Sequence, residues 1–136
     1  MNEFTWQIRV YYEDTDAIGM VYYANYLKFM ERARTEWLRA LGFEQSLLKA
    51  QYDFAIVVRH IDVDYLKPAL FDDLLTVHTR LHKLGKASMS VFQSIQRESV
   101  ILSQGTIRLA GIDANTMRPK AFPEVLLFQS TPNLIC

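Results

Sequence analysis

An acidic loop that leads into an amphipathic helix is the part of this sequence best suited to chemistry. The loop carries Glu13, Asp14 and Asp16, followed by Gly19, and a helical pattern begins at about Tyr23. The first turn of a helix offers unpaired backbone N–H groups and a partial positive charge that can polarise a carbonyl group. A carboxylate beside such a turn can attack that carbonyl or activate a water molecule.

A purely structural role for this loop is the competing interpretation. Asp, Thr and Gly are common in any loop that precedes a helix, and an aspartate near a helix start often caps it. Spacing alone favours capping over catalysis. Within the loop, Glu13 and Asp14 lie next to the end of a strand and are predicted to be solvated, whereas Asp16 is closest to the glycine and the helix. Asp16 is therefore the candidate for chemistry.

Other common kinds of site are not supported by the spacing of their residues. His78 and His82 would lie about 13 Å apart along a strand, too far to share one metal ion. The one cysteine, Cys136, gives neither a paired zinc-ligand pattern nor an internal disulfide. No glycine-rich phosphate loop and no G-x-S-x-G turn is present in the sequence. The sequence therefore predicts no metal site and no resident cofactor.

Composition favours one globular domain over residues 1–136. Half of the residues are hydrophobic, which is enough for a packed core. The 15 Lys and Arg residues balance the 15 Asp and Glu residues, which argues against a nucleic-acid binder. The sequence has no stretch of about 20 apolar residues and no signal-peptide pattern. We expect no integral membrane segment and a cytoplasmic location.

The elements that must position the loop follow from the periodicity of apolar residues. A strand is predicted from Thr5 to Tyr12, a long helix from Tyr23 to Leu41 that ends at Gly42, and a short helix near residues 46–50. Four strand-like runs follow over residues 54–66, 75–84, 87–97 and 101–112, with turns at 84–86 and 97–99. This order predicts an α+β domain with a mostly antiparallel sheet.

The long helix carries a wide apolar arc that covers about half of the helical wheel. Such an arc suits a helix that a curved sheet partly wraps. Arg34 interrupts it, and we interpret Arg34 as a snorkelling side chain at a subunit or loop contact. In the first strand after the short helix, alternation predicts one shared face for Ala55, Val57, Ile61 and Val63. One helix cannot cover both faces of a five-stranded sheet, so we expect an oligomer.

Residues 9–26 resemble the signature of the 4-hydroxybenzoyl-CoA thioesterase family, and the Thr15-Asp16-x-x-Gly19 block is its most specific part. Residues 31–36 are similar to the branch of short-chain acyl-CoA thioesterases associated with the Tol-Pal operon. The similarity continues through residues 54–58, 65–69 and 117–120, and so covers nearly the whole chain.

The resemblance implies a hotdog fold, in which a curved five-stranded antiparallel sheet wraps around one long helix and two sheets pair edge to edge in a homodimer or homotetramer. Asp16 takes the place of the catalytic aspartate, as nucleophile or as general base on water. The backbone N–H of Tyr23 takes the place of the group that polarises the thioester carbonyl. The loop residues Gly19, Val21 and Tyr22 are implied to contact substrate.

The expected activity is hydrolysis of a short-chain or aromatic acyl-CoA thioester, since Tyr23 resembles the hydroxybenzoyl-CoA enzymes rather than the Tol-Pal branch. The acyl group is expected in a tunnel between subunits, lined by the apolar end of the helix and residues near 54–58. Lys83, Lys86, Arg118 and Lys120 are candidates for binding the phosphates of coenzyme A.

Alternatives to this site and this activity remain open. Acyl carrier protein is an alternative carrier of the acyl group, and Glu31 on the helix is the rival carboxylate. A non-catalytic hotdog module that binds acyl-CoA or acyl carrier protein is the alternative function. Dehydration of carrier-bound substrates would need a histidine near the helix start, and residues 1–59 contain none.

Overall fold

The computed structural model describes residues 3–123, so Cys136 lies outside the described residues. In chain order the described elements are β1 (Glu3–Arg9), a 3₁₀ turn (Tyr12–Asp14), α1 (Tyr23–Ala40), α2 (Gln45–Tyr52), β2 (Phe54–Tyr65), β3 (Leu74–Leu84), β4 (Ser88–Arg97) and β5 (Val100–Asp113). The predicted order of one strand, a long helix, a short helix and four strands is confirmed.

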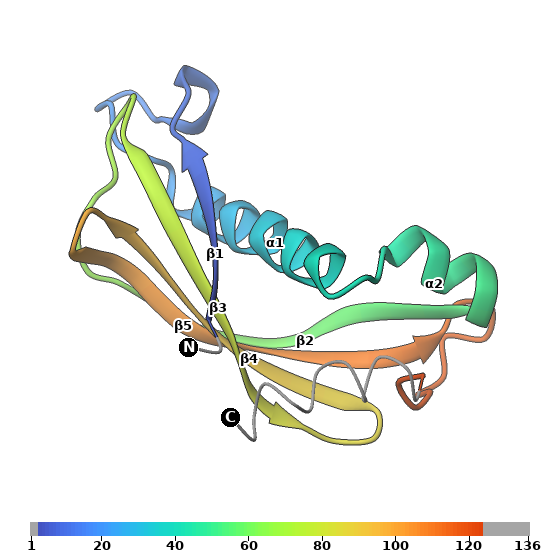
Figure 1. Ribbon diagram of the computed structural model, residues 1–136. Helices are drawn as coiled ribbons and strands as arrows, with labels where there is room; N and C mark the ends of the chain where they lie inside the picture. Colours follow the sequence, from blue (N-terminus) through green and yellow to red (C-terminus); the bar gives the residue numbers. More distant parts are fainter. Residues whose placement is uncertain (1–2, 124–136) are drawn as a thin grey trace.

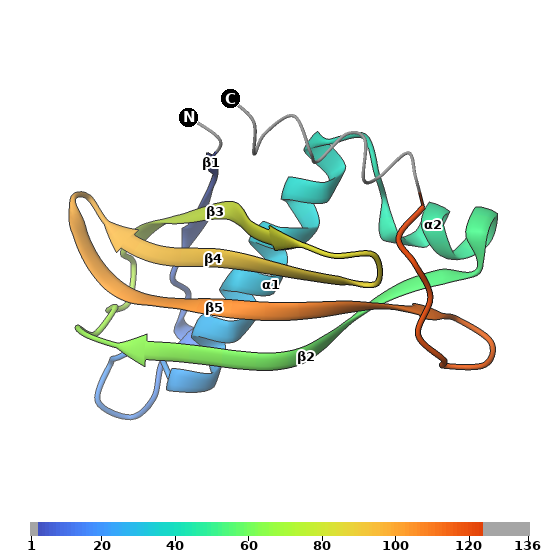
Figure 2. The same ribbon diagram turned by 90° about the horizontal axis from the view of Figure 1, so that it is seen from below.

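The five strands form one antiparallel sheet in the order β1-β3-β4-β5-β2. Figure 1 shows this sheet curving around α1, which lies along its concave side. Figure 2, seen from below, shows β3, β4, β5 and β2 side by side with α1 crossing behind them. The predicted α+β class, with a curved five-stranded antiparallel sheet around one long helix, is confirmed.

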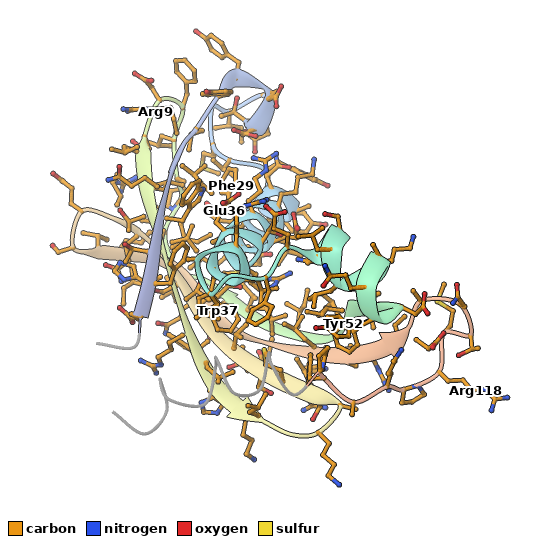
Figure 3. The ribbon with its side chains drawn as sticks, turned by 45° about the vertical axis from the view of Figure 1, so that its right-hand side comes forward. Arg9, Phe29, Glu36, Trp37, Tyr52 and Arg118 are labelled. Atoms are coloured by element: carbon orange, nitrogen blue, oxygen red, sulfur yellow. The ribbon has the colours of Figure 1, made fainter. Side chains whose placement is uncertain are left out.

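The core lies between α1 and the concave face of the sheet. Apolar residues recur at helical spacing on α1, and Phe29, Met30, Ala33 and Trp37 are buried. Figure 3 shows Trp37 between α1 and the sheet. Because the sheet bends around the helix, it contacts a wider arc than a flat sheet would. This packing explains why the apolar arc of the helix is so wide.

The first strand ends earlier than its alternation predicts. β1 stops at Arg9, and Tyr12 lies in the 3₁₀ turn with 77% of its surface exposed, so the predicted extension of the strand to Tyr12 is wrong. Val10 is still fully buried, and it exchanges backbone hydrogen bonds with Asp72 and Asp73 in the loop before β3. This contact with a distant loop turns the chain away from the sheet.

β2 does not keep one face inward along its whole length. Alternation predicts that Ala55 shares the core face with Val63, but Phe54 is the fully buried residue at the start of the strand. The register with β5 shifts between Val58 and His60. Such a bulge inserts one residue and exchanges the two faces. The prediction is therefore wrong before the bulge, whereas Val63, after it, packs against the core.

β2 is an edge strand of the sheet, paired with β5 on one side. It is 12 residues long and exposes the large apolar side chains Val58, Ile61 and Tyr65. A long edge strand with exposed apolar side chains is a template for pairing with another chain.

Neither helix within residues 3–123 has the length and apolar character that crossing a membrane requires.

Candidate active site

The acidic loop folds back on itself as a small hairpin that joins β1 to α1. Thr15 forms an isolated β-bridge with Val21, the N–H of Asp16 donates to the carbonyl of Met20 at 2.8 Å, and the N–H of Tyr22 donates to the carbonyl of Asp14 at 3.0 Å. Gly19 has a φ of +89°, which favours glycine at the turn. The hairpin thus fixes the loop acids relative to the start of α1.

The carboxylate of Asp16 is exposed to solvent and held in one orientation. Its Oδ1 atom accepts the backbone N–H of Ile18 at 2.9 Å and that of Met20 at 3.2 Å. Both of these bonds use the same oxygen, so Oδ2 faces no protein donor among the described residues. An exposed, oriented carboxylate with one available oxygen can act on a substrate carbonyl or on a water molecule.

The other two acids of the loop differ from each other. Glu13 is exposed, as predicted. Asp14 is only 8% exposed, and its Oδ2 atom accepts the backbone N–H of Tyr11 at 2.9 Å, so its predicted solvation is wrong. Its backbone carbonyl also accepts a hydrogen bond from the side chain of Asn25 at 2.9 Å. Asp14 therefore has a structural role that ties the loop to the first turn of α1.

α1 begins without a side-chain cap. Tyr22 is the N-cap residue and makes no side-chain capping bond, and the first turn carries no acidic residue. Helices usually satisfy their first N–H groups with a Ser, Thr, Asp or Asn side chain. The uncapped first turn of α1, starting at Tyr23, is therefore available to an oxygen atom of a ligand. It opens directly after the hairpin that holds Asp16.

Tyrosine side chains surround this helix start. The rings of Tyr22 and Tyr23 have centroids 4.8 Å apart, and Tyr65 of β2 lies edge-on to Tyr23 at 6.1 Å and to Tyr26 at 5.2 Å. The hydroxyl of Tyr26 accepts the backbone N–H of Ala69 at 2.9 Å. Burial raises the pKa of the Tyr65 hydroxyl, so this group stays neutral and is a poor base. The tyrosines form an apolar wall.

A cavity of about 110 Å³ lies further along α1, where the helix meets β2 and β5. Its lining is apolar on one side and polar on the other, with Glu31, Arg34, Thr35, Trp37, Leu38, Gln45, Ile56, Val58 and Leu109. A second cavity of about 260 Å³ lies beside it between α2 and β2. The first contacts α1 and the second does not, but both contact residues 54–58, part of the region in which the acyl group is expected. We call the first of them the Arg34 cavity.

Arg34 is buried in the core rather than snorkelling at the surface, so its predicted position is wrong. It is 7% exposed, and Nη1 donates to Oε1 of Gln93 at 3.0 Å. The amide of Gln93 in turn donates to the carbonyl of Met30 and to the hydroxyl of Thr79. Burial lowers the pKa of the Arg34 guanidinium. Its neighbour Glu31, the rival carboxylate, is exposed and accepts the hydroxyl of Thr35 at 2.8 Å.

The predicted phosphate-binding residues lie at the other end of the subunit from Asp16. Lys86 is exposed in the β3–β4 turn, and Arg118 projects into solvent from the loop after β5, as Figure 3 shows. Lys120 pairs with Asp113 and donates to the backbone carbonyl of Tyr52. Within one subunit these residues are thus far from the hairpin. Figure 1 shows the hairpin and the loop after β5 at opposite ends of the sheet.

Two further clefts carry basic residues, of which the sequence had singled out only Lys83 for phosphate binding. One, of about 390 Å³, is lined by Arg59, His60 and Arg108, and the other, of about 520 Å³, by His82, Lys83 and Arg108. No carboxylate lines either cleft. These residues come from three strands, so only strand pairing brings them together.

Within residues 3–123, no three His, Cys, Asp or Glu side chains are arranged to hold a metal ion.

Comparisons with known proteins point to one family. A family model described as the thioesterase-like superfamily matches residues 10–129. The acyl-CoA thioesterase YbgC of Haemophilus influenzae is 45% identical over 123 residues, covering 90% of each chain. The acyl-CoA thioester hydrolase YbgC of Escherichia coli is 41% identical over 125 residues, covering 91% of this chain and 92% of that protein. The crystal structure of a probable thioesterase from Bartonella henselae aligns at a TM-score of 0.86 and 36% identity, covering 89% of this chain and 99% of that one.

Proposed function

Because the chain belongs to the thioesterase-like superfamily, we propose that it hydrolyses short-chain or aromatic acyl-CoA thioesters to a free acid and coenzyme A. The names of its relatives support a thioester hydrolase, and the match to a solved thioesterase identifies the curved sheet around α1 as the hotdog fold. The observation that carries the proposal is the hairpin that holds the Asp16 carboxylate next to the uncapped start of α1.

The reacting groups have distinct roles in this proposal. The thioester carbonyl oxygen accepts a hydrogen bond from the backbone N–H of Tyr23, which stabilises the negative charge that develops on that oxygen. Asp16 either attacks the carbonyl carbon and expels the thiolate of coenzyme A, leaving an anhydride that water cleaves, or removes a proton from the water that attacks. The backbone at Gly19, Val21 and Tyr22 forms the wall beside the thioester. Hydrolysis by either route needs no metal and no redox cofactor.

The complete site requires a second copy of the chain. Tyr65 at one end of β2 lies beside Tyr23, whereas Phe54 at the other end pairs with Asp113, next to the predicted phosphate-binding residues. The two ends are about 36 Å apart along the strand, at roughly 3.3 Å per residue. Antiparallel pairing of two β2 edges brings the start of one strand against the end of the other. A homodimer formed in this way, alone or as half of a tetramer, joins the hairpin of one subunit to the basic end of its partner.

Coenzyme A would then cross the subunit boundary. Its thioester lies at the hairpin of one subunit, and its phosphates reach Lys86, Arg118 and Lys120 of the other. The cleft of Arg59, His60 and Arg108 begins beside this basic end, since Pro119 also lines it. Acyl carrier protein remains the alternative donor of the acyl group. Acyl-CoA substrates imply a cytoplasmic enzyme.

The test is the release of free thiol from a panel of short-chain and aromatic acyl-CoAs. Asp16→Asn keeps the shape of the side chain but removes its charge, and we expect kcat to fall by about 10²- to 10⁴-fold, the usual contribution of a general base. Glu13→Gln is the control, because it removes a neighbouring exposed charge of the same loop. Equal rates for wild type and Asp16→Asn would contradict the role of Asp16. Binding of acyl-CoA without any thiol release would make the chain a binding module.

A further inference from the structure

Arg34 carries a buried charge that the described residues leave largely unsatisfied. A guanidinium has five N–H donors. Among residues 3–123, its side-chain hydrogen bond is the one to the neutral amide of Gln93, and no carboxylate lies within the 4.0 Å of an ion pair. A buried arginine is ordinarily paired with an acidic group because desolvation of an unpaired charge is costly. Within residues 3–123, Arg34 therefore has no carboxylate in direct contact, and Glu31 acts on it only through its more distant charge.

Arg34 borders a space that a ligand can enter. Arg34 lines the cavity of about 110 Å³, while a single water molecule needs only roughly 10–15 Å³ of such space. Trp37, Leu38 and Ile56 supply an apolar wall. The nearest acid, Glu31, lies at the exposed rim and is hydrogen-bonded to Thr35. The cavity thus combines an apolar wall with the cationic Arg34 and a polar rim that includes Glu31.

The position of the cavity on β2 brings it close to a thioester in the proposed dimer. Within one subunit, Tyr23 and Arg34 are 11 residues apart on α1, about 16 Å at 1.5 Å per residue, which is too far for a short acyl group. The cavity also contacts Ile56 and Val58, near the start of β2. Antiparallel pairing places the start of this strand beside the partner's helix start. The acyl group then enters the Arg34 cavity from the partner's hairpin.

We propose that Arg34 selects acyl groups that carry an oxygen acceptor at their far end, with a terminal carboxylate as the best match. This inference rests on the proposed thioesterase function and deepens it by naming the substrate class. The guanidinium and a carboxylate form paired, charge-assisted hydrogen bonds whose geometry discriminates against an apolar chain end. Such a substrate supplies the directly contacting counter-charge that residues 3–123 do not.

The test compares five-carbon acyl-CoAs that differ only at the chain end. Pentanoyl-CoA ends in a methyl group, 5-hydroxypentanoyl-CoA in a hydroxyl group and glutaryl-CoA in a carboxylate. For Arg34→Met we expect kcat/KM on glutaryl-CoA to fall by about 10- to 100-fold, the value of a charge-assisted hydrogen bond. The fall in kcat/KM on 5-hydroxypentanoyl-CoA is smaller. On pentanoyl-CoA, kcat/KM of the variant stays within about threefold of wild type, because the methyl group makes no bond to the guanidinium.

Two control variants separate recognition from folding. Arg34→Gln retains a side chain that can bond to Gln93, and melting curves check that both Arg34 variants fold. Arg32→Met makes the same change at an exposed position of α1 and should leave the ratio of glutaryl-CoA to pentanoyl-CoA unchanged. An equal loss on all three substrates, or an unchanged ratio in Arg34→Met, would overturn the proposal.

A binding measurement distinguishes failure of this inference from failure of the proposed function. If wild type hydrolyses none of the three thioesters, calorimetric titration of the intact protein with glutaryl-CoA and pentanoyl-CoA still tests Arg34. Preferential binding of glutaryl-CoA that Arg34→Met abolishes supports the inference while the hydrolytic function fails. Equal binding of the two thioesters by wild type overturns the inference itself.

Discussion

Two aspartates in one loop have opposite surroundings, although they are separated by a single residue. Asp14 is buried and accepts the backbone N–H of Tyr11, whereas the Asp16 carboxylate is exposed with Oδ1 fixed by Ile18 and Met20. A buried carboxylate that is already bonded to backbone is suited to structure, and an exposed, oriented one is suited to chemistry. The division of roles follows from which oxygen atoms remain available to a substrate.

Replacement of Asp14 by alanine tests its structural role. Asp14→Ala leaves the N–H of Tyr11 without its acceptor, so we expect the free energy of unfolding to fall by about 1–2 kcal/mol. Urea denaturation measures this change. Asp14→Asn is the matched control, since its amide oxygen still accepts the bond and the loss should be smaller. A stability of Asp14→Ala equal to that of wild type would show that the contact is not stabilising.

At the scale of the element, the start of α1 is unusual because it has no side-chain cap. Its N-cap residue, Tyr22, has the extended backbone that is typical of this position, with φ −62° and ψ 132°. In the mechanism we propose, the backbone N–H of Tyr23, rather than any tyrosine hydroxyl, polarises the carbonyl.

Proline substitution tests the backbone N–H of Tyr23 directly. Proline lacks this N–H, is tolerated at the first position of a helix and favours an extended preceding residue, which Tyr22 already is. We expect Tyr23→Pro to fold and to lose about 10²- to 10³-fold in kcat, the cost of removing one oxyanion donor. Tyr23→Ala removes the same side chain but keeps the N–H. Equal kcat values for the two variants would contradict the assignment.

At the scale of the whole molecule, the two halves of the proposed site lie at opposite ends of a curved sheet. The hairpin is at one end of β2, and the basic residues and the Arg34 cavity are toward the other. A monomer cannot bring them together without bending the sheet. Pairing of two β2 edges does so by symmetry alone, and it covers the apolar side chains exposed along this strand.

A charge placed in the middle of the β2 edge tests this arrangement. Lysine on an edge strand opposes strand pairing, so Ile61→Lys should sediment as one chain of 15.8 kDa and lose most thioesterase activity. Thr5→Lys makes a similar change on β1, the opposite edge of the sheet, and should keep the mass and activity of wild type. A wild-type protein that is fully active as a monomer would contradict the shared site.

The sequence by itself determined the order of the elements, the antiparallel α+β class and the loop that carries Asp16. These features depend on local spacing, because apolar periodicity and turn residues act over a few positions of the chain. The extent of the helix Tyr23–Ala40 is a clear example, since its pattern stops at Gly42. The thioesterase resemblance was likewise carried by contiguous residues.

Only the tertiary structure decided which polar side chains are buried and which face the bulged strand turns inward. From the sequence, Arg34 is expected at the surface. In the structure it is buried, and it donates a hydrogen bond to Gln93, which is 59 positions away. Asp14 is buried where its backbone carbonyl accepts hydrogen bonds from Tyr22 and Asn25, and the β2 faces exchange at a bulge set by pairing with β5. Contacts between distant segments have no local period, and burial depends on those contacts. The cavity at Arg34 is therefore a property of the fold, which one element's pattern does not reveal.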